Sequence, residues 1–146
     1  MYRILMAIDG SKHSGKVIEE VIAIARPLQA EVTALNVTGE FDFKSRISVH
    51  MSDEYWTQIR KNLEEVAEGI VGEAVRKLDD NGISAKSEIV IGQQSPADVI
   101  CKMADEGGYN LLVLGSKGLR GIQEAFLGSV SNKVAHCVRT NVLIVK

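Results

Sequence analysis

Two glycine-containing segments carry the residues whose types and spacing suit anion binding. The first, residues 10–17, nearly matches the P-loop pattern G-x-x-x-x-G-K-[ST]. Its last position is Val17, which has no hydroxyl for a Mg²⁺ ion, and no apolar segment ends in an Asp of the Walker B kind. The same residues fit a turn followed by a helix that Ser11 or Ser14 caps. We favour the turn and keep the P-loop as the alternative.

The second segment has glycines at 115, 118, 121 and 128, and a short amphipathic pattern begins after the last of them. Glycines let backbone N–H groups approach an anion closely, and the start of a helix adds further N–H donors. Lys117 and Arg120 could add charge, and Ser129 and Ser131 could add hydroxyl donors. The pattern predicts a phosphate-binding cradle; the alternative is a surface loop before a capped helix. The dinucleotide pattern G-x-G-x-x-G is absent.

Catalytic chemistry has no comparable signal in this sequence. His13, His50 and His136 are scattered, and no nucleophile, base and orienting group share a suggestive spacing. Cys101 and Cys137 lie in separate apolar, helix-like segments without metal-ligand spacing. We expect them to be reduced thiols acting as small core residues, as in a cytoplasmic protein, and we expect no metal site.

Composition narrows the class of protein further. The 146 residues are 45% hydrophobic and 25% charged, which predicts one globular domain over residues 1–146 with a core of its own. The formal net charge of -2 has the wrong sign for nucleic-acid binding as a main function. No apolar run approaches the roughly 20 residues that cross a bilayer, so we expect neither a membrane span nor a signal peptide.

Strand and helix patterns alternate along the chain. Apolar runs at 111–114 and 142–145, a nearly continuous one at 2–8 and the segment 31–37 predict strands. The alternating run 83–91 predicts an edge strand with one solvent face. Helical spacing follows the first strand up to Pro27, and Ser95-Pro96-Ala97-Asp98 is typical of a capped helix start. This order predicts an α/β fold with an open, mostly parallel sheet covered on both faces.

The longest pattern runs from Asp53 to Asp80, where apolar residues recur every three or four positions. We interpret it as a helix on the sheet, with a coiled coil as the alternative. Asn81-Gly82 should end this helix. Residues 38–52, which precede it, have no clean period and are interpreted as a long surface loop.

Over essentially its whole length the sequence resembles the universal stress protein (UspA-like) family, in its ATP-binding subgroup. The start ILMAIDGS is similar to that family's first strand and turn, and Gly115-x2-Gly118-x9-Gly128-Ser129 matches its ATP-binding signature without a gap. The ending VLIV resembles the family's last strand. The resemblance implies a doubly wound, Rossmann-like fold of the adenine nucleotide alpha hydrolase type. Its five parallel strands would have the order 3-2-1-4-5, with ATP between the first and fourth strands.

The resemblance also implies roles for particular residues. Ala7 and Asp9 would lie by the nucleoside, and the backbone of Val37 would meet adenine. The ribose and phosphates, with any Mg²⁺ held through the phosphates, would be bound by Gly115, Ser116, Lys117, Gly118, Leu119, Arg120, Gly121, Gly128, Ser129, Val130 and Ser131.

Three functions stay open on these observations. The leading hypothesis is an ATP-binding regulatory or stress-response protein; the alternatives are a slow Mg²⁺-dependent ATPase and a dimeric adaptor without nucleotide. A strand at Val142, Leu143, Ile144 and Val145 would form an unprotected sheet edge, which predicts a homodimer that pairs these strands. A monomer with this edge covered is the alternative.

Overall fold

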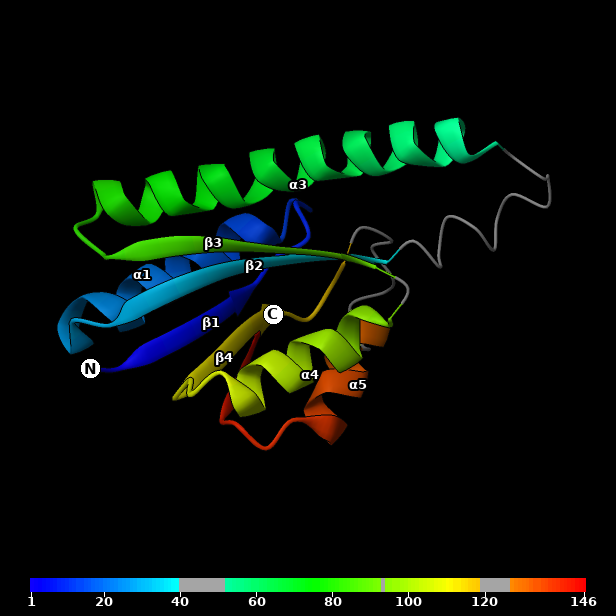
Figure 1. Cartoon of the computed structure of the whole chain (residues 1–146). Helices are drawn as coiled ribbons and strands as arrows, with labels where there is room; N and C mark the ends of the chain where they lie inside the picture. Colours follow the sequence, from blue (N-terminus) through cyan, green and yellow to red (C-terminus); the bar gives the residue numbers. More distant parts are fainter. Residues whose placement is uncertain (40–51, 93, 119–126) are drawn as a thin grey trace.

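The computed structural model describes residues 1–39, 52–92, 94–118 and 127–146. Nine helices and strands lie in these ranges, and Figure 1 shows their arrangement. In chain order they are β1 (Arg3–Ala7), α1 (Ser14–Leu28), β2 (Glu31–Gly39), α3 (Asp53–Asp80), β3 (Ala85–Gly92), α4 (Pro96–Glu106), β4 (Leu111–Gly115), α5 (Ser129–Cys137) and β5 (Val142–Val145).

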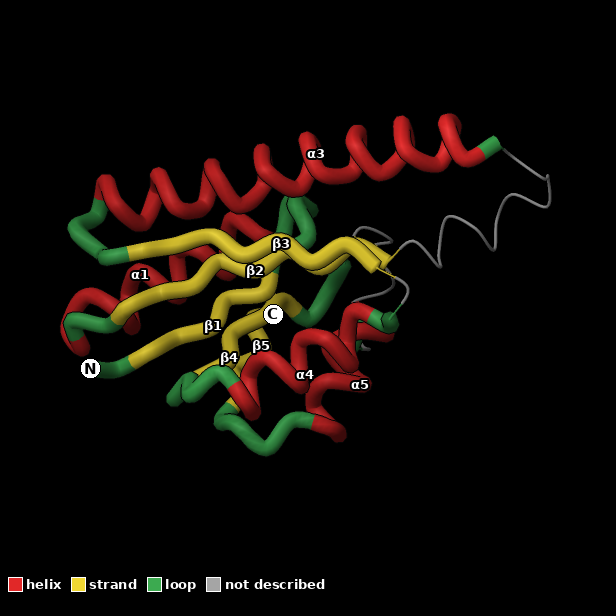
Figure 2. Tube along the Cα trace, viewed as in Figure 1, coloured by secondary structure: helices red, strands yellow, loops and turns green. Residues whose placement is uncertain are grey.

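The five strands form one parallel sheet in the order β3-β2-β1-β4-β5. This confirms the strand order that the family resemblance implied, with the strand predicted as an edge lying at one side. Neighbours of β1 are β2 and β4, so the strand order reverses at β1 (Figure 2). Ligands bind in open α/β sheets at such a reversal, outside the carboxyl ends of the strands.

Helices cover both faces of the sheet. On one face α1 and α3 pack on the strands, and the fully buried residues there include Ile4, Met6 and Val21. On the other face α4 and α5 pack around Leu5, Leu112 and Val134 (Figure 1). Consecutive β1 residues point to opposite faces, which explains why this strand is apolar at nearly every position.

Most element boundaries agree with the sequence pattern. α3 spans the predicted range, Asn81 is its C-cap, and Gly82 has a φ of +74°, which favours glycine. The Ser95 hydroxyl caps α4 by accepting from the Asp98 N–H, with Pro96 at the first position. α1 includes Pro27 in its last turn instead of ending before it.

The predicted loop at residues 38–52 needs a correction at its start. Thr38 and Gly39 continue β2, because they pair with Ile91 and Gly92 of β3. Ser52, at the other end, is the N-cap of α3. Residues 40–51 lie outside the described residues.

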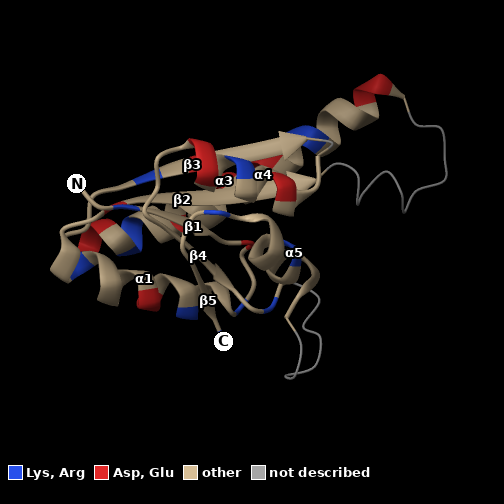
Figure 3. Ribbon diagram, turned by 90° about the horizontal axis from the view of Figure 1, so that it is seen from below, with Lys and Arg blue, Asp and Glu red and all other residues tan. Residues whose placement is uncertain are grey.

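The apolar stripe of α3 meets the sheet only in the helix's second half. Its buried residues are Ala67, Val71, Ala74 and Leu78, whereas Val66, which the pattern assigned to the stripe, is 62% exposed. α3 contacts β3 and β2, which agrees with a helix laid on a sheet and not with the coiled-coil alternative. Lys, Arg, Asp and Glu are interspersed over the described elements (Figure 3). None of the described helices is both long and apolar enough to span a membrane.

The expectation of two reduced thiols is wrong in this structure. Cys101 of α4 and Cys137 of α5 form a disulfide bond, with their Cα atoms 6.3 Å apart. The bond spans 36 positions of sequence, and only the packing of α4 beside α5 brings the two side chains together. Cys101 is buried as expected, but Cys137 is exposed.

Candidate functional site

The segment after β1 places Asp9 at the strand reversal. The last backbone hydrogen bond between β1 and β2 is donated by the Ile8 N–H to the Leu35 carbonyl oxygen at 2.9 Å. Asp9 follows, and its Oδ1 accepts from the Ser11 N–H at 2.9 Å and the Ser14 hydroxyl at 3.2 Å. Its Oδ2 accepts no hydrogen bond from the described residues and faces Gly118, where a Cβ would lie 3.1 Å from it. One carboxylate oxygen thus orders the turn, and the other faces the glycine segment.

The turn after β4 is held against the start of α5 by backbone hydrogen bonds. The Ser116 carbonyl oxygen accepts from the Gly128 N–H at 2.7 Å and from the Ser131 hydroxyl at 3.3 Å. The Ser116 N–H in turn donates to the Val145 carbonyl oxygen at 2.7 Å. The two parts of the predicted cradle, residues 115–118 and 128–131, therefore lie side by side although the chain between them is long.

A side chain at Gly128 would enter the space between these segments, and one at Gly118 would point toward Asp9. A Cβ on Gly128 would lie 3.2 Å from the Ser116 carbonyl oxygen and 3.7 Å from the Gly118 nitrogen. A Cβ on Gly118 would lie 3.1 Å from Asp9. Contacts this short are tighter than most real Cβ contacts, so glycine at both positions keeps backbone nitrogen atoms approachable.

Among the described residues, no side chain caps the N-terminus of α5. Gly128 is its N-cap and makes no side-chain capping bond, and the first turn contains no acidic residue. The N–H groups of a first helical turn have no partner within the helix, and the helix dipole favours an anion beside them. Ser129 is exposed here. Ser131 is only 3% exposed and its hydroxyl donates to backbone carbonyl oxygens, so it supports the turn instead of offering a donor to solvent.

The backbone of Val37 points toward the same reversal. The Leu35 carbonyl oxygen faces β1, since it accepts from Ile8. Backbone groups of alternate residues point to the same side of a strand, so the N–H and C=O of Val37 face that side too. β1 pairs with β2 only as far as Leu35, and no described strand therefore pairs with Val37 on this side.

The remaining predicted residues divide into two groups. Ala7, at the end of β1, is 8% exposed, and Lys117 and Val130 are half-buried. Leu119, Arg120 and Gly121 lie outside the described residues.

The P-loop alternative at residues 10–17 receives no support. α1 begins at Ser14, so Gly15 and Lys16 belong to its first turn, and Lys16 is exposed. Gly10 has a φ of +77° and makes the turn after β1. Neither serine caps the helix with its side chain, because the N-cap is His13. The segment is a turn and a helix start, as favoured from the sequence.

Two residues that sequence reasoning missed help to position the site. The Asn36 side chain is buried, and its Nδ2 donates to the Ile8 carbonyl oxygen at 2.9 Å, which fixes the end of β1. The His13 ring packs against Gly115, where a Cβ would lie only 2.6 Å from Cδ2. A polar residue within the apolar run of β2 was the available signal for Asn36; none existed for His13.

An ion pair joins α5 to α4 beside the site. Lys133 Nζ lies 2.9 Å from Asp98 Oδ2 and donates to the Ser95 hydroxyl at 3.2 Å. The hydrogen bond from Lys133 holds the pKa of Asp98 below its ordinary value. Within the described part of the chain, no group of three or more His, Cys, Asp or Glu could hold a metal ion. The arrangement of the described residues suits an anion.

Comparison with known proteins gives relatives over the full length. The sequence matches the Universal stress protein family over residues 1–146. It is 33% identical over 147 residues to the universal stress protein YxiE of Bacillus subtilis, covering 99% of this chain and 98% of that protein. The structure of MJ0577 from Methanocaldococcus jannaschii superimposes with a TM-score of 0.85 at 29% identity, covering 99% of this chain and 95% of that one.

A second similar structure is that of a universal stress protein in complex with cAMP. Its TM-score is 0.67 at 25% identity, and the match covers 99% of this chain and 96% of that one. Because the family matches throughout and the sheet has the strand order that the sequence resemblance implied, the chain belongs to the universal stress protein family.

Proposed function

We propose that this universal stress protein is an ATP-binding regulatory protein with the nucleotide at the carboxyl ends of β1, β2 and β4. The observation that carries the proposal is the close approach of residues 115–118 to residues 128–131, where a Cβ on Gly128 would meet the Ser116 carbonyl oxygen. A Cβ on Gly118 would meet Asp9 beside it. The uncapped start of α5 supports it, since its N–H groups suit phosphate oxygens.

The proposed contacts follow the geometry of the described residues. The phosphates bind the backbone of Gly118 and the N–H groups of Ser129 and Val130, while Gly115, Ser116 and Ser131 hold the turn in place. Lys117 adds positive charge, and Leu119, Arg120 and Gly121 belong to the same proposed set of phosphate-binding residues. Adenine meets the N–H and C=O of Val37, and Ala7 and Asp9 flank the nucleoside.

The residues fit an adenine nucleotide better than a smaller anion. A cradle of backbone donors accounts for phosphate, and the N–H and C=O of Val37 together provide the donor and acceptor that an adenine edge requires. The cAMP complex of a similar universal stress protein also favours an adenine nucleotide. Mg²⁺ would be held through the phosphates and would neutralise their charge, and Asp9 Oδ2 is the carboxylate oxygen facing that space.

Substitution of the cradle glycines tests the proposal. We expect Gly118→Val or Gly128→Val to abolish ATP binding, because the added atoms occupy the space that phosphate needs. Calorimetric titration with ATP measures this, and circular dichroism shows that the variants fold. Lys16→Ala is the control, since Lys16 is exposed on the rejected P-loop segment and its loss should change the affinity little. Unchanged affinity in both glycine variants, or a loss of about a hundredfold, near 2.7 kcal/mol, in Lys16→Ala, would overturn the assignment.

The proposal extends to assembly and location. The domain formed by residues 1–146 works as a homodimer joined along β5, a sheet-edge strand whose four residues are apolar and only half-buried. A two-fold axis beside this strand would pair the two copies. We place the protein in the cytoplasm, where ATP is available.

A further inference from the structure

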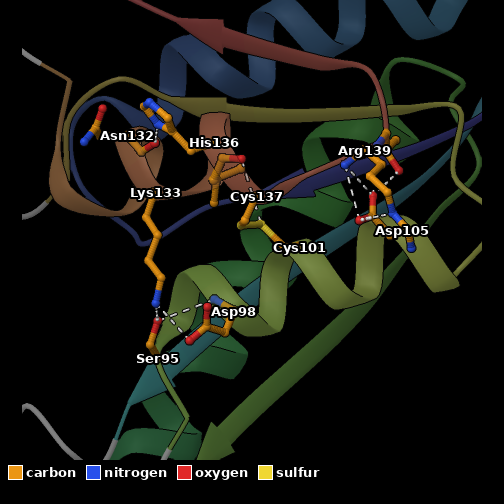
Figure 4. The surroundings of a disulfide bond; sticks show 11 residues. Ser95, Asp98, Cys101, Asp105, Asn132, Lys133, His136, Cys137 and Arg139 are labelled. Carbon is orange, nitrogen blue, oxygen red and sulfur yellow. Dashed lines mark hydrogen bonds and ion pairs between the residues drawn. A yellow bond between two sulfur atoms is a disulfide. The ribbon is translucent and has the colours of Figure 1, made fainter.

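The disulfide joins the helix that carries the proposed phosphate site to its neighbour. Cys137 is the last residue of α5, Cys101 lies in the middle of α4, and Figure 4 shows the bond between the two helices. We propose that Cys101 and Cys137 form a reversible thiol–disulfide exchange site whose redox state sets the affinity for nucleotide. The coupling to nucleotide rests on the proposed function; the exchange chemistry does not.

The two cysteine residues differ in their exposure to solvent. Cys137 is exposed at the end of a helix, whereas Cys101 is 7% exposed within the apolar layer under α4 and α5. An external thiolate can approach the Cys137 sulfur, and access decides which sulfur of a disulfide is attacked. Cys137 is therefore the entry point, and Cys101 is the leaving group.

Reduction of the disulfide requires two thiol groups from outside the protein. A small dithiol or two molecules of a monothiol such as glutathione supply them. A thiolate attacks Cys137 Sγ, the Sγ–Sγ bond breaks, and Cys101 leaves as a thiolate that takes up a proton. A second thiolate attacks the reagent's sulfur in the mixed disulfide, which releases Cys137 as a thiolate that is then protonated. Two reagent thiols become one reagent disulfide, and two protein thiols form. The reagent disulfide reverses both steps.

The surroundings of Cys101 accommodate the reduced state. Ala97, Ile100 and Leu112 belong to the same apolar cluster, and a buried thiol behaves as a small hydrophobic group. The Val134 carbonyl oxygen lies 3.9 Å from Cys101 Sγ, so the thiol formed by reduction has an acceptor beside it. Reduction therefore leaves no buried polar group without a partner.

The position of Cys137 couples this chemistry to the site. α5 has nine residues, with the cradle at its first turn and Cys137 at its end. Little apolar side-chain surface of α5 is buried, since Val134 is its one fully buried apolar residue. The Lys133–Asp98 ion pair is about half exposed. Asp105 holds Arg139 and Thr140, beyond the helix. The disulfide is thus the covalent restraint on α5 itself, and its loss should loosen the first turn.

The direction of the coupling follows from preorganisation. A tethered α5 presents its N–H donors in one arrangement. The helix therefore loses less conformational entropy when phosphates bind to it. We expect the oxidised protein to bind ATP about five- to tenfold more tightly than the reduced protein, which is at the low end of usual coupling strengths. Disulfides in a cytoplasmic protein are usually transient or redox-sensing, which agrees with a bond that has one exposed sulfur.

The test uses the full chain equilibrated in buffers of varied reduced-to-oxidised glutathione ratio. Alkylation and intact mass give the fraction of disulfide, calorimetry gives the ATP affinity, and hydrogen exchange reports on the amides of residues 129–134. The control is Cys101→Ala/Cys137→Ala, which should resemble the reduced protein and ignore the glutathione ratio. Wild type should change reversibly between two states, with faster exchange at residues 129–134 and weaker ATP binding when reduced.

Each possible result of this experiment overturns a different part of the proposal. A folded wild type whose disulfide resists the whole range of ratios refutes the exchange site. Equal ATP affinity and equal hydrogen exchange in the two forms refute the coupling. Absence of ATP binding in both forms refutes the proposed function and the coupling with it, while the alkylation result still decides whether the pair exchanges. A redox response that persists in the double alanine variant would show that another group is responsible.

Discussion

His13 Nε2 lies 2.7 Å from the carbonyl oxygen of Val145, so the residue before α1 is bonded to the last residue of β5. The same carbonyl oxygen accepts from the Ser116 N–H. Val145 therefore joins the start of α1 to the turn after β4, and the final strand stabilises the segment in which we place phosphate. The absence of a side chain at Gly115 leaves room for the His13 ring.

Removal of the His13 ring should weaken this link. His13→Ala is expected to lower the free energy of unfolding by about 1 kcal/mol, the usual net contribution of a hydrogen bond, and also to weaken ATP binding. Urea denaturation and calorimetry measure the two effects. His136→Ala is the matched control, because His136 is exposed and its Nδ1 bonds to the Asn132 carbonyl oxygen of its own helix. Equal effects of the two substitutions would contradict a specific role for His13.

The outward-facing groups of β5 allow a selective test of the dimer. The Asn141 and Val145 carbonyl oxygens accept from β4, so by alternation the backbone of Ile144 points away from the sheet. Ile144→Pro removes an outward donor and keeps the hydrogen bonds to β4, a position where sheets tolerate proline. We expect wild type to sediment as a dimer at micromolar concentration and this variant as a monomer.

Ile144→Val, which retains the N–H, controls for the smaller side chain and should stay dimeric. A monomeric wild type would refute the dimer, and a dimeric proline variant would refute this interface.

Asp105 should contribute a stability that depends on pH. Burial raises the pKa of Asp105, but hydrogen bonds from Thr140 and Arg139 outweigh burial and hold the pKa below its ordinary value of 3.8. The folded state thus binds the proton less readily than the unfolded state. The contribution is present above the ordinary pKa and is lost as the pH falls through the lower folded-state pKa.

We expect Asp105→Asn to lower the free energy of unfolding by about 2 kcal/mol at neutral pH, as for hydrogen bonds to a charged group, and by less in acid. Denaturation with urea at several pH values measures this difference. Glu106→Gln, at the exposed neighbouring position, should have little effect at any pH. A difference between wild type and Asp105→Asn that stays constant down to pH values well below 3.8 would contradict the assignment.

Local sequence was enough to predict the elements and their class. Runs of apolar residues that are buried on both faces, such as Leu111–Gly115, can hardly be anything but strands of a covered parallel sheet. Ser95 and Pro96 specify the start of α4 through bonds within one turn. The glycine pattern by itself predicted the phosphate cradle. The strand order and the roles of Ala7, Asp9 and Val37 came from the family resemblance, because no local pattern states which strands are neighbours.

Tertiary structure determined the contacts between residues that are far apart in the sequence. The Cys101–Cys137 bond, the contact of His13 with Val145 and the facing of Asp9 toward Gly118 each join residues far apart in sequence. The pattern of α3 was also insufficient, because Val66 and Ala67 both fit an apolar stripe and only the direction in which the helix crosses the sheet selects Ala67. A sequence determines the periods of its own elements; the packing of one element on another determines which side chains meet.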